Sequence, residues 1–180
     1  MIHDLDILLT GEDTISTHVN YLYRNDGGGA FVQLATTLDP VNNCSLSLGD
    51  ADNDGDPDVG LAGHLIDGTL VSHVYRNDGG GTFTDMPSGL PPFFGASLAW
   101  GDADHDGDPD LLASGQTGSG SVAGVYRNDG GMFTPMTSNL PGVSSGVTTW
   151  GDIDGDGDLD LLVAGGMDGG GAVARLCRND

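Results

Sequence analysis

Short runs of alternating apolar and polar residues recur along this chain, separated by clusters of Gly, Asp, Asn and Ser. In the best-defined stretch such runs occupy residues 97–100, 110–115, 122–126 and 132–134. A period of two is typical of half-buried β-strands, and these runs are too short for helices. The Asn-Asp-Gly-Gly segment at 128–131 accepts the positive φ angles of a hairpin turn. The pattern therefore predicts four short strands joined by tight turns.

The four-strand pattern belongs to an internal repeat. The word Tyr-Arg-Asn-Asp begins at Tyr23, Tyr75 and Tyr126 and returns as Cys-Arg-Asn-Asp at Cys177, with spacings of 52, 51 and 51 residues. Four-stranded units repeating at this length are typical of the blades of a β-propeller, and a β-solenoid with shorter coils is the structural alternative. We therefore expect an all-β chain of about three and a half four-stranded blades, forming a single partial propeller domain over residues 1–180.

Each complete repeat also carries a loop in which Asp alternates with other residues. The word Gly-Asp-x-Asp-x-Asp-Gly-Asp-x-Asp begins at Gly49, Gly101 and Gly151, and its positions are counted here from the first Asp. Calcium prefers six to eight oxygen ligands, and carboxylates on alternate residues of a tight loop converge on one point. We predict three Ca²⁺ sites, with side chains at positions 1, 3, 5 and 9, the main-chain carbonyl at position 7, and Gly at position 6 for the sharp turn. The candidate metal ligands are Asp50, Asp52, Asp54, Asp56, Asp58, Asp102, Asp104, Asp106, Asp108, Asp110, Asp152, Asp154, Asp156, Asp158 and Asp160.

Two other interpretations of these loops are less favourable. An acidic surface turn without metal places five carboxylates within nine residues, and two carboxylates about 5 Å apart repel by roughly 0.8 kcal/mol even in bulk water. It also leaves the glycine at position 6 unexplained. An EF-hand begins in the same way but needs Glu at position 12, which here is Leu61, Ala113 or Val163 inside an apolar run.

The acidic loop and the Tyr-Arg-Asn-Asp-Gly-Gly-Gly-x-Phe-Thr segment that follows it resemble the FG-GAP/VCBS repeat, over essentially the whole chain. The resemblance implies an integrin-α-like β-propeller, usually with seven blades. It also implies that calcium binds in the loop between the first and second strands of each blade, with the aspartates named above as its ligands.

The two outer repeats are incomplete. The predicted repeats are 1–43, 44–95, 96–145 and 146–180. The first keeps only Asp4 and Asp6 of its acidic loop, and we expect no calcium there. The last stops before the strand that completes its siblings. We therefore expect strands two to four in the first repeat and strands one to three in the last, with open strand edges that permit self-association.

Charge narrows the range of possible partners. The chain has 27 acidic residues, of which Glu12 is the only Glu, against five Arg, and its formal net charge is −22. This charge argues against binding to nucleic acid and to anionic membrane surfaces. No apolar run is long enough to insert across a membrane. The two cysteines, Cys44 and Cys177, lie 133 residues apart and are interpreted as unpaired thiols.

Other repeated residues have structural interpretations. Trp100 and Trp150 share one repeat position, where packing between blades is favoured over stacking on a sugar. Four arginines recur in the Tyr-Arg-Asn-Asp words, and we expect them to pair with nearby Asp or carbonyl groups. No Ser-His-Asp or Cys-His constellation is visible, so the chain is not predicted to be an enzyme.

The pattern favours an extracellular or cell-surface module that binds an unidentified protein or glycan, with calcium as a structural ion. The alternative is an accessory propeller of a larger secreted enzyme. Catalysis by the propeller itself is a third possibility, but no His or carboxylate outside the acidic loops repeats at an inner position. Ligand contacts are expected on the variable segments at the end opposite the acidic loops, where Phe93 and Phe94 stand out.

Overall fold

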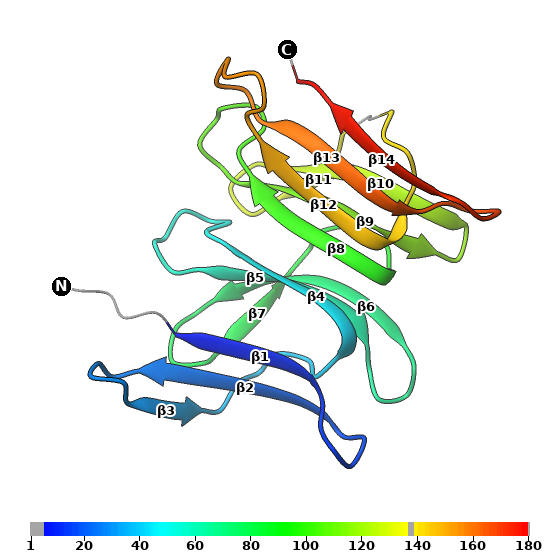
Figure 1. Cartoon of the computed structure of the whole chain (residues 1–180). Coiled ribbons are helices and arrows are strands. Elements are labelled where there is room, and N and C mark those ends of the chain that lie inside the picture. The colour runs from blue at the N-terminus through cyan, green and yellow to red at the C-terminus, as the bar shows by residue number, and fades with distance from the viewer. Residues whose placement is uncertain (1–5, 137–138, 180) are drawn as a thin grey trace.

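The computed structural model describes residues 6–136 and 139–179, which form four small antiparallel sheets (Figure 1). In each sheet the strand order follows the sequence. The first sheet contains β1 (Ile7–Glu12), β2 (His18–Asn25) and β3 (Phe31–Leu34). The second contains β4 (Asn42–Gly49), β5 (Asp58–His64), β6 (Leu70–Asn77) and β7 (Phe83–Met86). The third contains β8 (Phe94–Gly101), β9 (Asp110–Thr117), β10 (Gly120–Asn128) and β11 (Phe133–Pro135), and the fourth contains β12 (Ser144–Gly151), β13 (Asp160–Gly166) and β14 (Ala172–Cys177).

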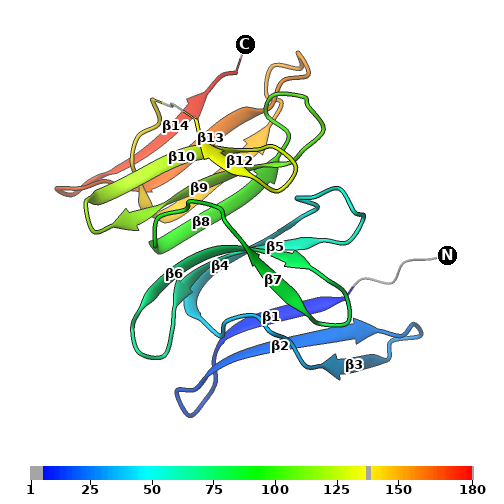
Figure 2. The same cartoon turned by 180° about the vertical axis from the view of Figure 1, so that it is seen from behind.

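The sheets are successive propeller blades, which confirms the predicted all-β fold. The first strand of each complete blade lies against the first strand of the next, so that β4 contacts β8 and β8 contacts β12. Figures 1 and 2 show the sheets following one another, with each sheet turned relative to its neighbour. The first sheet starts with a second strand and the fourth sheet ends with a third strand, as the sequence predicted.

Apolar side chains are buried between the blades. Trp100 packs on the backbone of the preceding blade, and a Cβ added to Gly49 would lie 2.5 Å from its ring. Trp150 packs on Gly101 in the same way and donates a hydrogen bond from Nε1 to the carbonyl of Ala99 at 3.0 Å. These contacts confirm that the repeated tryptophan serves packing between blades.

The three inner strands share a bulge that the sequence analysis did not anticipate. The register shifts after Asn42, Phe94 and Ser144, the first residues of β4, β8 and β12. The next residue has a positive φ in all three blades: 43° at Asn43, 57° at Gly95 and 49° at Ser145. An extra residue in one strand bends it locally.

The segments that contain these bulges were predicted to be variable loops between blades, but their first residues belong to the buried interior. These residues are Val41, Phe93 and Val143, and each is at most 1 % exposed. Phe93 packs against Gly115, since a Cβ on that glycine would lie 2.8 Å from the Cβ of Phe93. Of the two phenylalanines offered as alternative partner contacts, Phe93 is therefore excluded and Phe94 remains the candidate. Phe94 is 42 % exposed and lies edge-on to the ring of His64 at 5.3 Å.

The first sheet leaves one blade interface uncovered. Leu48 is the counterpart of Trp100 and Trp150, and it is 53 % exposed, since the described part of the first sheet contains no inner strand that would cover it. A groove between the first and second sheets is lined by Leu48 together with Leu8, Leu22, Val59 and Phe83.

Cys44 and Cys177 are both free thiols. Within the described ranges, no helix has the length and apolar character needed to cross a membrane.

Candidate metal centres

The three acidic loops connect the first strand of a blade to its second, between β4 and β5, β8 and β9, and β12 and β13. In Figure 1 they lie at the end of the blades opposite the hairpins that join the second and third strands. Position 6 is Gly55, Gly107 or Gly157, with φ of 96°, 95° and 99°. L-residues with a side chain avoid this conformation. The glycine N–H donates to the position 1 carboxylate in every loop, at 3.1 to 3.2 Å.

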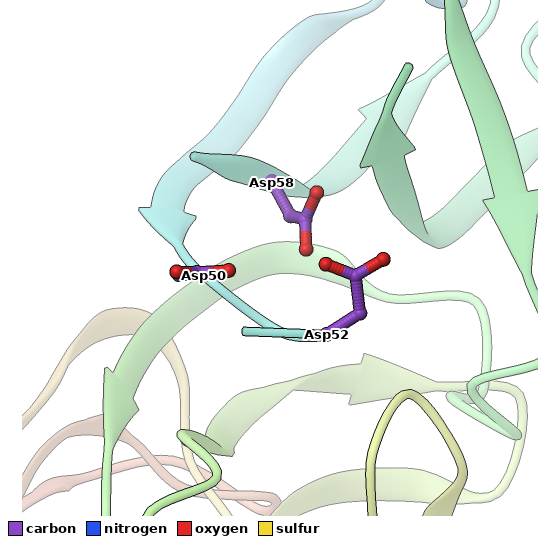
Figure 3. Close-up of side chains that lie close together, drawn as sticks. All are labelled: Asp50, Asp52 and Asp58. Carbon is purple, nitrogen blue, oxygen red and sulfur yellow. The ribbon is translucent and has the colours of Figure 1, made fainter. Parts of the chain in front are cut away.

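Each loop brings three carboxylates together. In the first complete loop, ligand atoms of Asp50, Asp52 and Asp58 all lie within 4.8 Å of one another. Figure 3 shows the carboxyl groups of Asp52 and Asp58 turned toward the same space, with Asp50 beside them. The triads of the other two loops are Asp102, Asp104 and Asp106, and Asp152, Asp154 and Asp156.

The triads include nine of the fifteen predicted ligands. Those outside them are Asp54, Asp56, Asp108, Asp110, Asp158 and Asp160. Position 7 is absent from all three triads, in keeping with a ligand role for its main-chain carbonyl. The third member of the triad is the position 9 aspartate in the first complete loop and the position 5 aspartate in the other two loops.

The position 9 carboxylate also ties the loop to the third strand. Asp110 is fully buried, and it accepts the N–H of Ala103 at Oδ2 (3.0 Å) and the N–H of Asn128 at Oδ1 (2.9 Å). Asp58 and Asp160 accept the same pair of bonds in their own blades. The sequence pattern predicted only a ligand role for these residues. The signal in the sequence was the spacing of 18 or 19 residues between position 9 and the Asn of the Tyr-Arg-Asn-Asp word.

This second role persists in the first sheet. Asp6, the position 9 residue there, accepts the N–H of Asn25 at 2.8 Å. The position 9 carboxylate therefore makes this structural contact in the first sheet as well.

Burial and hydrogen bonding act on the position 9 groups in opposite directions. Burial raises the pKa of Asp58 and Asp110, although their two backbone hydrogen bonds oppose the shift. In Asp160 the hydrogen bonds from Asn179 and Ile153 outweigh burial and lower the pKa.

The donor set fits a hard cation such as Ca²⁺. All ligand atoms are carboxylate oxygens, which calcium and magnesium prefer. The Oδ1 atoms of Asp50 and Asp102 are buried and have no hydrogen-bond partner among the described residues. Buried polar atoms normally have a partner, and a cation in the triad would supply one. It would also offset a repulsion of roughly 1 kcal/mol per carboxylate pair, estimated for bulk water.

The repeated arginines lie next to this end of the blades. Arg24, Arg76 and Arg127 each pair with the Asp two residues later, at 2.6 to 2.8 Å. Arg178 lies 2.8 Å from Asp154 and 3.6 Å from Asp156, at the fourth sheet's triad. The expected pairing of these arginines with nearby Asp is confirmed.

Comparison with known proteins agrees with this architecture. The sequence profile of the FG-GAP-like repeat matches residues 3–61 and 67–113, more than half of the chain. The chain belongs to the FG-GAP-like repeat family. The two matched stretches include the complete acidic loops of the second and third sheets, so the FG-GAP-like assignment rests on the same words as the candidate metal centres.

The fold of this FG-GAP-like chain also resembles a solved structure. A triple arginine-to-alanine mutant of AofleA from Arthrobotrys oligospora matches with a TM-score of 0.60 and 16 % sequence identity. The match covers 96 % of this chain and 49 % of the AofleA chain, so the FG-GAP-like chain spans about half of that protein's length. No curated protein sequence matches the chain.

Proposed function

We propose that this chain is a calcium-binding propeller module that acts outside the cell or at its surface and binds a protein or glycan without catalysis. The observation that carries the calcium assignment is the set of three acidic triads, two of which contain a buried carboxylate oxygen without a partner. Extracellular calcium modules bind with dissociation constants of about 10⁻⁴ to 10⁻³ M, which suits an extracellular calcium level of about 1 mM.

Calcium stabilises the acidic end of the blades in this proposal, and the partner binds at the opposite end. Phe94 supports this placement, because its partly exposed ring lies at the start of β8, away from the acidic loops. Variable residues on a rigid scaffold are frequent binding positions. The absence of catalysis is proposed because, among the described residues, the groups of His, Cys, Asp or Glu close enough to share a metal ion consist of loop aspartates alone.

Calcium titration tests the proposal directly. Calorimetry of chelator-treated protein should give three sites per chain, one for each complete loop. At ten times its dissociation constant, calcium should add about 1.4 kcal/mol to stability per site, so chelation should lower the melting temperature. Magnesium should restore stability poorly, because it requires octahedral geometry near 2.1 Å and releases water reluctantly. No bound calcium, or an unchanged melting temperature after chelation, would contradict the proposal.

A further inference from the structure

The asparagine of the Tyr-Arg-Asn-Asp word reaches from one blade to the acidic loop of the blade before it. The side-chain amide of Asn128 donates to the carbonyl of Ala51 at 2.7 Å, across a sequence separation of 77 residues. The side chain of Asn179 donates to the carbonyl of Ala103 at 3.1 Å in the same manner. Ala51 and Ala103 both occupy position 2 of their loops. The contact therefore repeats from blade to blade.

This contact holds the position 2 residue from both sides. The N–H of Ala51 donates to Asp58 at 2.8 Å, while its carbonyl accepts from Asn128. Position 2 lies between two triad members, Asp50 and Asp52. Fixing its two polar groups restricts the backbone from which both carboxylates project. Fewer arrangements are then lost when a ligand binds, which raises affinity.

The exposure of the position 2 residue differs among the three loops. Ala51, which accepts the bond from the fully buried Asn128, is itself fully buried. Ala103, which accepts the bond from Asn179, is partly buried. Ile153, the position 2 residue of the fourth sheet, is 57 % exposed, and no asparagine of a following blade contacts it within the described part of the chain.

A second contact joins successive loops. Asn53, at position 4, donates from Nδ2 to the position 7 carboxylate of Asp108 in the next blade at 2.5 Å. The equivalent His105 has its Nδ1 3.5 Å from the position 7 carboxylate of Asp158, and its Nε2 lies 3.0 Å from the carbonyl oxygen of Gly157. Asn53 and His105 adopt φ of 59° and 60°, and this turn directs both side chains to the neighbouring loop. Each of the first two acidic loops thus contacts the acidic loop of the next blade directly.

We propose that Asn128 and Asn179 are positioning residues for the metal centre of the preceding blade, so that each calcium loop reaches full affinity only when the next blade is docked beside it. This inference rests on the proposed calcium function. Groups that orient metal ligands through hydrogen bonds typically change metal affinity by about 10- to 100-fold when they are removed.

Asn179→Ala provides the sharpest test. Its described side-chain bond goes only to the third sheet's loop, while its main-chain N–H, which alanine keeps, serves the fourth sheet's loop. The amide NMR signals of Gly55, Gly107 and Gly157 report on the three loops separately, because each N–H donates to a position 1 carboxylate that a bound cation neutralises. Calcium titration should show about tenfold weaker binding at Gly107, with Gly55 and Gly157 within about twofold of the unmodified protein.

Two further variants complete the experiment. Asn128→Ala should weaken binding at Gly55, and it keeps the proposal testable if Asn179→Ala does not fold. Asn77→Ala is the matched control, because its amide donates to Pro57 of its own blade, and it should leave Gly107 and Gly157 unchanged. Melting temperatures in chelator identify any variant that has merely lost stability.

The outcomes separate the two proposals. If no glycine responds to calcium in the unmodified protein, the calcium function itself fails. If all three respond and Asn179→Ala leaves Gly107 unchanged, or weakens all three loops equally, the calcium function stands and the positioning role is wrong.

Discussion

At the scale of single residues, aspartates of one repeated word have different tasks. The position 1 and position 3 carboxylates point into the triads, whereas the buried position 9 carboxylate accepts two backbone N–H groups. A carboxylate oxygen has two lone pairs, so a position 9 residue that accepts a hydrogen bond can also offer an oxygen to a cation. Asp58 has both properties, because it accepts the N–H of Ala51 and belongs to the triad of the first complete loop.

Replacing Asp110 by Asn should therefore destabilise the protein even without calcium. One of the two buried acceptors becomes an NH₂ group that faces a backbone N–H, at a cost of about 1–3 kcal/mol. Asp106→Asn is the matched control: Asp106 is exposed, and its Oδ1 acceptor for Asp108 is kept. Urea unfolding of both variants in EDTA measures the difference. Equal effects of the two substitutions would contradict the structural role of position 9.

The adjacent phenylalanines provide a second prediction. Phe93→Ala should cost about 3–5 kcal/mol of stability because it empties a buried site between blades. Phe94→Ala should change stability by less than about 1 kcal/mol, since its ring is partly exposed. Denaturation measures both stability changes. The proposed binding end further requires Phe94→Ala to weaken binding of the partner, and calcium calorimetry should show that calcium binding is kept. Normal partner binding by this variant would place the contact elsewhere.

At the scale of elements, the blades are joined by repeated pairs of a large and a small residue. Trp100 and Trp150 fit against glycines at the end of the preceding inner strand, Gly49 and Gly101. The inner strand thus contributes an aromatic ring to one neighbour and a glycine surface to the other. This arrangement accounts for the glycine that begins the acidic-loop word in the second and third sheets.

The third prediction compares equivalent glycines. Gly49→Ala places a methyl group 2.5 Å from the Trp100 ring and should cost about 1–3 kcal/mol through overpacking. Gly151→Ala should be nearly neutral, because a Cβ there meets nothing within 4 Å. Thermal denaturation of the two variants distinguishes them. A loss as large for Gly151→Ala would indicate a backbone requirement rather than packing against tryptophan.

At the scale of the whole molecule, the sheets expose apolar surface where a further blade or strand would pack. Leu9 is 51 % exposed, Leu48 53 % and Leu176 49 %. They belong to the first, second and fourth sheets, away from the well-covered interface between the second and third sheets.

The isolated 180-residue chain should therefore self-associate. Burying these side chains is favourable by about 25 cal/mol per Å² of apolar surface, and unpaired strand edges add main-chain hydrogen bonds. Sedimentation velocity over a range of concentrations should show reversible growth beyond the 18.3 kDa monomer. A single monomeric species at every concentration would contradict this expectation.

The sequence by itself determined the repeat, the four strands of each blade, the incomplete outer sheets and the position of the acidic loops. These features are local: alternation, turn residues and the glycine at position 6 specify them within a few residues of one another. The same local signals identified Trp100 as a packing residue and the loop aspartates as candidate ligands.

Only the tertiary structure decided how those aspartates divide between ligand and backbone partner. The decision depends on residues such as Asn128, which is 18 positions from Asp110 and 77 from Ala51 but contacts both. It also decided which of the two adjacent phenylalanines is buried, since Phe93 is 1 % exposed and Phe94 is 42 % exposed. Contacts between blades join residues about one repeat apart or more, and no local pattern specifies which polar groups meet there.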